Sequence, residues 1–138
     1  MAIDKILIDT NAYASFKRGD ITAVEIIRYS HFIGINTIVL GELLSGFAVG
    51  NQESLNRQEL ETFLKSPRVK VLAVDHETAE HYAEIYKKLR QKGRPIPTND
   101  LWIAATAIQY NLAVFTYDEH FKVVNEIRIG SRLIDFIT

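Results

Sequence analysis

Four carboxylates in this 138-residue chain stand at positions where an acidic side chain can do chemistry. Asp9 and Asp118 each follow a short apolar run of the length of a strand. Glu42 interrupts an apolar segment of helical length, and Asp100 stands at the start of another. Taken singly, each has an ordinary explanation, such as a helix cap, a turn, a distant salt bridge or a favourable interaction with a helix dipole.

Together, the four carboxylates predict a metal site. Two carboxylates about 4 Å apart repel by about 4 kcal/mol at an effective dielectric constant near 20, so a cluster of four needs a multivalent cation. Ligation by oxygen alone selects Mg²⁺ or Mn²⁺ rather than zinc, and substrate phosphates commonly complete the coordination shell of such ions. The chemistry predicted is hydrolysis of phosphodiester bonds by a metal-activated water. Polar neighbours are expected to support the ligands as hydrogen-bonding partners: Thr10, Asn11, Asn99 and Thr116.

Apolar runs of strand length alternate along the chain with longer stretches of helical periodicity. Strands are predicted at residues 3–8, 31–36, 69–74 and 113–116, with a fifth candidate at 126–129. Helices are predicted at 10–29 with a break near Gly19, and at 37–49, 54–65, 76–91 and 100–110. Asp75 and Asn99 are expected to cap the last two of these helices.

This alternation predicts an α/β fold, a three-layer α/β/α sandwich around a parallel sheet, in a single domain spanning residues 1–138. The helix that follows Asp100 is apolar on nearly every side and is expected to be buried. In such sheets ligands bind beyond the carboxyl ends of the strands. Asp9 and Asp118 are therefore expected to open onto the same edge of the sheet.

Composition excludes several classes of protein and site. Of the residues, 47% are apolar and none is cysteine, which argues against disorder, a disulfide framework and a thiolate zinc site. No apolar run approaches the roughly 18 residues of a membrane span, and no basic segment leads into an apolar stretch at the N-terminus. The sequence predicts a cytoplasmic protein without a membrane partner.

A basic stretch runs through Lys87, Lys88, Arg90, Lys92 and Arg94. The net charge is −1, and without the four suspected site carboxylates it would be +3. Two interpretations stay open for the basic stretch: a solvated helix end, where cations are favoured, or a surface that contacts RNA through Lys87, Arg90, Lys92 and Arg94.

Histidines and aromatic residues are not expected to take part in the chemistry. The four histidines, His31, His76, His81 and His120, lack metal-binding spacing and are expected to be ordinary surface or structural residues. The aromatic side chains of Trp102, Tyr110 and Phe115 are expected in the core rather than as platforms for base stacking.

The order of these motifs resembles the PIN-domain nucleases and, more narrowly, the VapC-type toxins of toxin–antitoxin pairs. The resemblance covers essentially the whole chain. Its most specific parts are the segment from Pro95 to Ala105 and the Thr-x-Asp-x-x-Phe run from Thr116 to Phe121. The family's acidic positions correspond one by one to Asp9, Glu42, Asp100 and Asp118.

This resemblance implies a parallel sheet of four or five strands and cleavage of single-stranded or looped RNA that depends on Mg²⁺ or Mn²⁺. It also implies a homodimer and inhibition by a VapB-like antitoxin whose C-terminal segment enters the acidic groove. Which RNA is cut stays open.

Two other functions are alternatives to this one. A catalytically silent PIN-like domain that binds RNA or a partner has no need of four mutually repelling carboxylates. A phosphatase of the haloacid-dehalogenase type also places an Asp after its first strand, but it requires a second Asp where this chain has Asn11.

Overall fold

A five-stranded sheet forms the centre of the computed structural model, which describes residues 3–137. The strands are all parallel and lie in the order β3-β2-β1-β4-β5. The strands are β1 (Ile6–Ile8), β2 (Ile33–Asn36), β3 (Val69–Leu72), β4 (Ala113–Phe115) and β5 (Ile129–Gly130). The α-helices are α1 (Thr10–Lys17), α2 (Ile21–Tyr29), α3 (Thr37–Val49), α4 (Glu53–Leu64), α5 (His76–Lys92) and α6 (Thr98–Tyr110). Two short 3₁₀ helices, η1 (Glu119–Val123) and η2 (Leu133–Phe136), complete the described chain.

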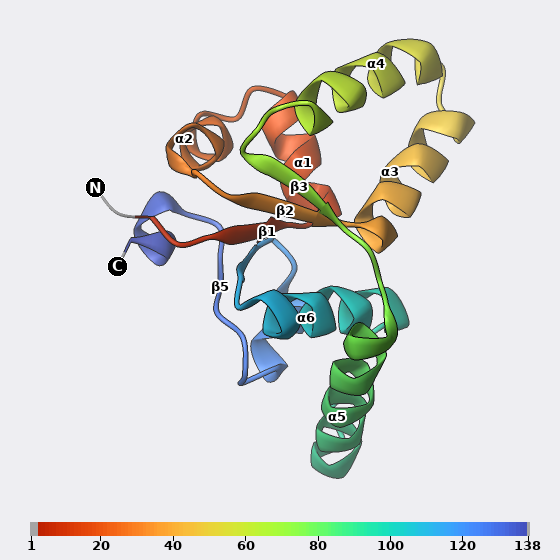
Figure 1. Cartoon of the computed structure of the whole chain (residues 1–138), viewed down its shortest axis with the longest axis vertical. Coiled ribbons are helices and arrows are strands. Elements are labelled where there is room, and N and C mark those ends of the chain that lie inside the picture. Colours follow the sequence, from red (N-terminus) through yellow and green to blue (C-terminus); the bar gives the residue numbers. More distant parts are fainter. Residues whose placement is uncertain (1–2, 138) are drawn as a thin grey trace.

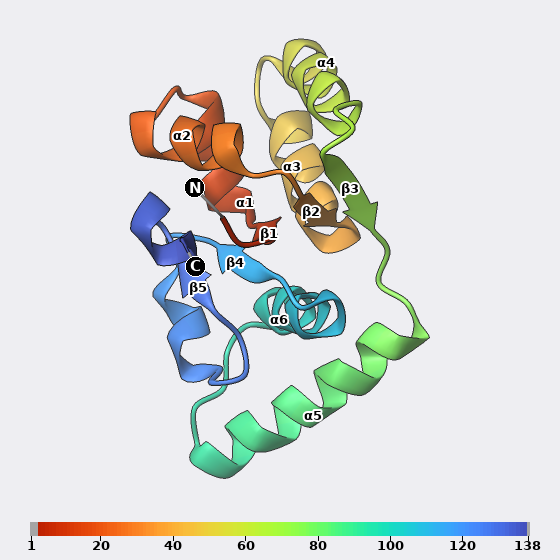
Figure 2. The same cartoon turned by 60° about the vertical axis from the view of Figure 1, so that its left-hand side comes forward.

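Helices cover both faces of the sheet (Figure 1). The first helices, α1 and α2, lie on one face, while α6 lies on the other, with α5 packed outside it and projecting away from the sheet (Figure 2). The predicted three-layer α/β/α sandwich with a parallel sheet is therefore confirmed. In the described chain no helix combines the length and the apolar character that crossing a membrane requires.

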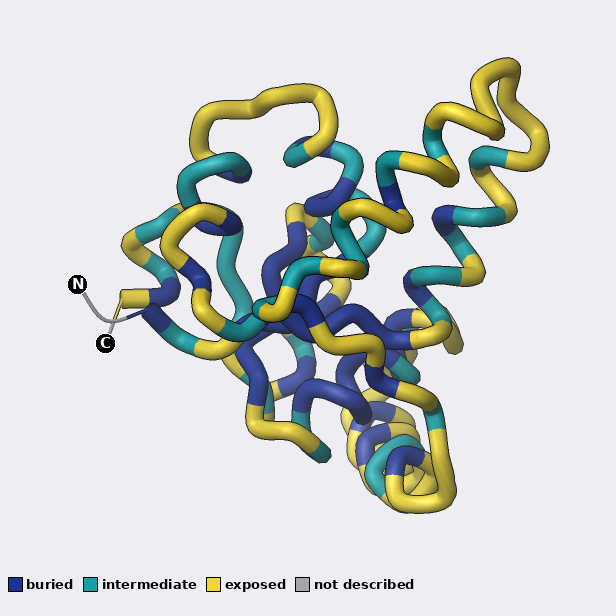
Figure 3. The backbone as a smooth tube through the Cα atoms, turned by 45° about the horizontal axis from the view of Figure 1, so that its top comes forward, coloured by how far each residue is buried: buried dark blue, intermediate teal, exposed yellow. Residues whose placement is uncertain are grey.

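The centre of the core is formed by β1, β2, β4 and α6, and apolar residues of the other α-helices pack around them. Every residue of β1 is buried, as expected for a central parallel strand covered on both faces. Five consecutive residues of α6, from Ile103 to Ala107, are buried as well, which agrees with the prediction for this helix. Buried segments gather in the middle of the molecule, whereas the turn between α3 and α4 is exposed (Figure 3).

Several strand boundaries differ from the predicted ones. The first strand begins at Ile6, because Ile3 instead makes an isolated antiparallel bridge to Ile137. The second begins at residue 33 rather than 31, and the third ends at residue 72 rather than 74. The fifth is displaced to residues 129–130, where its backbone pairs with β4. The residues left out of the hydrogen-bonded ladder differ in burial, since Ile3 packs in the core whereas His31 and Ala73 are exposed.

The prediction that Asn99 caps α6 is wrong. This helix begins at Thr98, directly after two prolines that cannot continue a helix, and its N-cap residue is Pro97. Asn99 therefore lies in the first turn, and its amide is free to reach across to α3. The preceding helix, α5, ends as its sequence suggests, at Gly93 in the left-handed conformation (φ 67°).

Candidate active site

Asp9 lies at the carboxyl end of the central strand β1, beside the end of β4. The register pairs Ile8 with Phe115, so Asp9 and Thr116 follow the two strands side by side. The hydroxyl of Thr116 donates to Oδ2 of Asp9 at 2.7 Å, and the backbone N–H of Thr10 donates to Oδ1 at 2.8 Å. Asp9 is thus the N-cap of α1, but it is also buried, with 5% of its surface exposed.

Glu42 reaches the same edge from α3, which continues from β2. Its two carboxylate oxygens accept hydrogen bonds from different elements: from the Thr10 hydroxyl at 2.6 Å and from the Asn99 amide at 3.2 Å. The ordinary explanation for Glu42 is a salt bridge to a distant Lys or Arg. Within residues 3–137, no salt bridge involves Glu42. Thr10 therefore links the carboxylates of Asp9 and Glu42.

Asp100 and Asp118 complete the group from the other side. Asp100 lies in the first turn of α6 with 9% of its surface exposed. Asp118 caps η1, and its backbone N–H donates to the Thr116 hydroxyl at 2.9 Å. The structure thus brings all four predicted acids to one edge of the sheet, where Thr116 connects Asp118 to Asp9.

Asn11 lies at the margin of this group rather than against a carboxylate. Its side-chain oxygen accepts a hydrogen bond from the backbone N–H of Tyr117 at 3.1 Å and lies 3.5 Å from the Thr116 hydroxyl. Because that hydroxyl has a much shorter contact with Asp9, Asn11 serves to hold the loop after β4 against α1.

His120, predicted to be an ordinary surface or structural histidine, also belongs to this cluster. Its Nδ1 lies 3.0 Å from Oδ2 of Asp100 and 3.0 Å from Oδ1 of Asp118. The signal in the sequence was its position two residues after Asp118, at the start of a turn that no periodicity predicts.

Of the three aromatic residues expected in the core, only Phe115 is fully buried. Trp102 is half-buried with its ring 4.1 Å from that of Tyr82, and Tyr110 is 39% exposed at the end of α6, contrary to the prediction.

Burial and mutual repulsion make ionisation costly at this edge. Burial, together with the negative charges of Asp100 and Glu42, raises the pKa of Asp9 to about 6, although hydrogen bonds from Thr116 and Thr10 oppose the rise. Burial also raises the pKa of Asp100, assisted by repulsion from Asp118 and Glu42 and opposed by the hydrogen bond with His120. The same hydrogen bond raises the pKa of His120.

Apart from His120 beside Asp100 and Asp118, the described residues offer these carboxylates no cationic partner. Within residues 3–137, no Lys or Arg nitrogen lies within 4.0 Å of a carboxylate oxygen of Asp9, Glu42, Asp100 or Asp118. A divalent cation would remove the repulsion among them, and hard oxygen donors of this kind fit such an ion. The four carboxylates and His120 are the side chains that could hold it.

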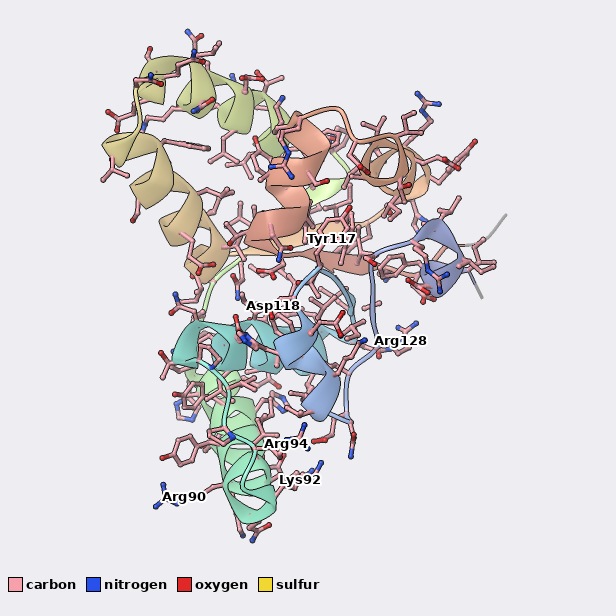
Figure 4. All side chains as sticks on the ribbon, turned by 180° about the vertical axis from the view of Figure 1, so that it is seen from behind. Arg90, Lys92, Arg94, Tyr117, Asp118 and Arg128 are labelled. Carbon is pink, nitrogen blue, oxygen red and sulfur yellow. The ribbon has the colours of Figure 1, made fainter. Side chains whose placement is uncertain are left out.

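The basic stretch lies at the exposed end of α5 and in the loop that follows. Arg90, Lys92 and Arg94 extend from this end, on the face of the molecule that also presents Tyr117 and Asp118 (Figure 4). Lys88 differs from the others because its ammonium group lies 3.5 Å from a carboxylate oxygen of Glu126. Four exposed cations remain near the loop that leads into Asp100: Lys87, Arg90, Lys92 and Arg94.

Comparisons with known proteins agree with this arrangement. Residues 6–127 match the model of the PIN domain. The chain is 32% identical to ribonuclease VapC2 of Rickettsia felis over 80% of this chain and 84% of that protein. It is 26% identical to ribonuclease VapC4 of Mycobacterium tuberculosis over 94% and 98% of the two chains.

A solved structure has the same fold. The crystal structure of DNA-bound VapBC from Salmonella typhimurium superposes with a TM-score of 0.82 at 28% identity, covering 93% of this chain and 98% of that one. Sequence, fold and the convergence of acids at one edge of the sheet thus agree, and the chain belongs to the PIN domain family, among relatives that are VapC ribonucleases.

Proposed function

We propose that this protein is a metal-dependent endoribonuclease, the toxin component of a VapBC-type toxin–antitoxin pair, and that it uses Mg²⁺ or Mn²⁺. The observation that carries the proposal is the convergence of Asp9, Glu42, Asp100 and Asp118 without a Lys or Arg partner within residues 3–137. Similarity to proteins named as VapC ribonucleases supports RNA as the substrate.

The chain's own residues hold and orient the reacting groups. Asp9, Glu42, Asp100 and Asp118 would hold the cation, and a bound divalent ion would lower the pKa of water and stabilise negative charge that develops on the phosphate. Thr116 and Thr10 fix the Asp9 carboxylate through its two oxygens. Thr10 and Asn99 do the same for Glu42, so both carboxylates are oriented before substrate binds.

The basic end of α5 is proposed as the surface that holds the RNA backbone. Arg90, Lys92 and Arg94 are exposed on the same face as Asp118, and Lys87 lies one turn of helix before Arg90 (Figure 4). Phosphate contacts of this kind bind without reading the sequence and weaken as salt rises. They would hold the strand while the acidic edge cuts it.

Two partners follow from the proposed function. A VapB-like antitoxin is supported by similarity to the VapBC assembly from Salmonella typhimurium, in which that toxin is bound to its partner. A homodimer and a cytoplasmic location, both expected from the sequence, stay predictions.

The proposal is tested by expressing the wild type and Asp100→Asn in a bacterial host and mapping newly formed RNA ends across the transcriptome. We expect discrete new ends with the wild type and none with the variant, because an amide at residue 100 removes one anionic ligand while keeping its shape. Circular dichroism would verify that both proteins are folded. Identical ends from folded Asp100→Asn protein would exclude the mechanism.

The same experiment tests the basic surface with the double variant Arg90→Glu/Arg94→Glu. We expect the same cleavage positions at a frequency about 10-fold lower, since the cations bind the backbone and do not select the site. Unchanged frequency in this variant would remove α5 from the proposed RNA path.

A catalytically silent binding domain is the alternative function. It predicts that the purified wild type and Asp9→Asn bind RNA equally and that neither cuts it in Mn²⁺. The phosphatase alternative no longer applies, because the match over residues 6–127 assigns the chain to a different family.

A further inference from the structure

His120 is directed into the acidic edge by its neighbours on η1. Its backbone N–H donates to Oδ1 of Asp118 at 2.9 Å, which fixes the start of this short helix. Phe121, the next residue, is fully buried and anchors the helix in the core. The imidazole, although 55% exposed, is therefore held with Nδ1 toward Asp100 and Asp118.

The separations within this group fit a shared ion. Nδ1 of His120 lies 3.0 Å from one carboxylate oxygen of Asp100 and 3.0 Å from one of Asp118. Ligand atoms of the three residues all lie within 4.8 Å of one another. An octahedral ion with ligands at about 2.1 Å places adjacent ligand atoms about 3.0 Å apart and opposite ones about 4.2 Å apart.

We propose that Nδ1 of His120 is a nitrogen ligand of the divalent cation, shared with Asp100 and Asp118. The inference rests on the proposed function, in which these carboxylates hold an ion. It changes the character of the site from oxygen donors alone to a mixed set, and imidazole suits transition metals far better than Mg²⁺. The protein should therefore bind Mn²⁺ in preference to Mg²⁺, and His120 is the residue that sets this preference.

The same distances are also compatible with a histidine that only donates a hydrogen bond to the carboxylates. The two roles differ in what the ion contacts: a ligand nitrogen is bonded to the metal, whereas a hydrogen-bonding ring is not. Among residues 3–137 no other histidine is grouped with two acids in this way, so a nitrogen signal from the metal would come from His120.

Pulsed electron paramagnetic resonance of the Mn²⁺-loaded protein tests this directly, because it detects nitrogen bonded to the ion. We expect ¹⁴N coupling in the wild type and in the control His31→Gln, whose histidine is exposed and outside the cluster. In wild-type protein labelled with ¹⁵N-histidine, ¹⁵N coupling should replace the ¹⁴N coupling. In His120→Gln, the nitrogen coupling should be absent.

Titration gives the second readout. His120→Gln should lower the affinity for Mn²⁺ about 10-fold and leave that for Mg²⁺ almost unchanged. Tight Mn²⁺ binding without nitrogen coupling in the wild type would overturn the role of His120 and leave the proposed function standing. Failure of the wild type to bind Mn²⁺ or Mg²⁺ would overturn both.

Discussion

Asp9 and Asp75 occupy equivalent places in the local structure. Each follows a strand of the parallel sheet and caps the helix after it, Asp9 through the backbone N–H of Thr10 and Asp75 through that of Thr78. The two residues differ in burial, since Asp9 is buried and Asp75 is exposed. Burial and nearby negative charge raise the pKa of Asp9 to about 6, whereas the Thr78 and Gln109 hydrogen bonds lower the pKa of Asp75.

The difference arises from the position of each strand in the sheet. Because β1 is central, Asp9 lies beside Thr116 at the end of β4 and near two other carboxylates, Glu42 of α3 and Asp100 of α6. In contrast, β3 lies at the edge of the sheet. Within residues 3–137, the hydrogen-bond donors to Asp75 are neutral groups, among them the Gln109 amide at 3.0 Å. The exposed carboxylate of Asp75 is stabilised by its hydrogen-bond donors and by solvent. The buried carboxylate of Asp9, which lies near other acids, needs a cation to offset the repulsion.

Asn36 shows what a buried cap requires when no ion is bound. It is the last residue of β2. Its side chain caps α3 by accepting from the N–H of Val39 at 2.9 Å and donates to the Thr106 hydroxyl at 3.1 Å, so its contacts involve no charged group. A neutral amide thus satisfies the same structural need at the neighbouring strand. The charge at Asp9 is therefore a cost to stability that the proposed chemistry explains.

The sharpest test of this contrast is cleavage by purified Asp9→Asn and Asp75→Asn proteins. Both variants keep their helix caps, because Asn caps as well as Asp does. We expect Asp9→Asn to reduce the cleavage rate of an RNA substrate in Mn²⁺ by more than about 100-fold, since it removes a ligand. Asp75→Asn should stay within about 3-fold of wild type. Equal losses in the two variants would mean that Asp9 acts only as a cap.

A smaller effect is expected from the threonines that hold the two carboxylates. Thr116→Val leaves Oδ2 of Asp9 without its 2.7 Å donor and should weaken Mn²⁺ binding about 10-fold in calorimetric titration. Thr78→Val, which removes the corresponding hydroxyl contact from Asp75, should leave Mn²⁺ affinity unchanged in the folded protein. A loss in both variants would point to general loosening of the structure instead.

A separate effect concerns the stability of the metal-free protein, measured by urea unfolding in a chelator. Because the folded-state pKa of Asp9 is raised from 3.8 to about 6, the native state binds the proton more tightly and stability falls as pH rises through this window. Asp9→Asn should therefore be more stable than wild type at pH 8, by up to about 3 kcal/mol, with the gain vanishing near pH 4.

Asp75→Asn should behave in the opposite way, because the pKa of Asp75 is lowered. Its ionised form stabilises the fold above the unfolded-state pKa, and this contribution is lost as pH falls. The variant should be slightly less stable than wild type at pH 8, with the deficit disappearing in acid. A gain for Asp9→Asn that does not change with pH would contradict the electrostatic origin of the cost.

Much of this architecture was predictable because it is local. The alternation of short apolar runs and helical periodicity predicted the parallel three-layer sandwich, and the position of acids after apolar runs predicted which edge of the sheet would carry them. Boundaries were less accurate, as at residues 3 and 129, since hydrogen-bonded pairing depends on the neighbouring strand and not on apolar character.

The sequence by itself determined the elements, the parallel sheet and the four candidate acids, because residue periodicity and chain order are enough for these. Only the tertiary structure decided that Asp9 is buried among acids while Asp75 is not, and that Asn99 reaches Glu42 instead of capping its helix. It also decided that His120 faces the carboxylates. Burial and repulsion depend on distances between segments far apart in the chain, and packing alone sets those distances.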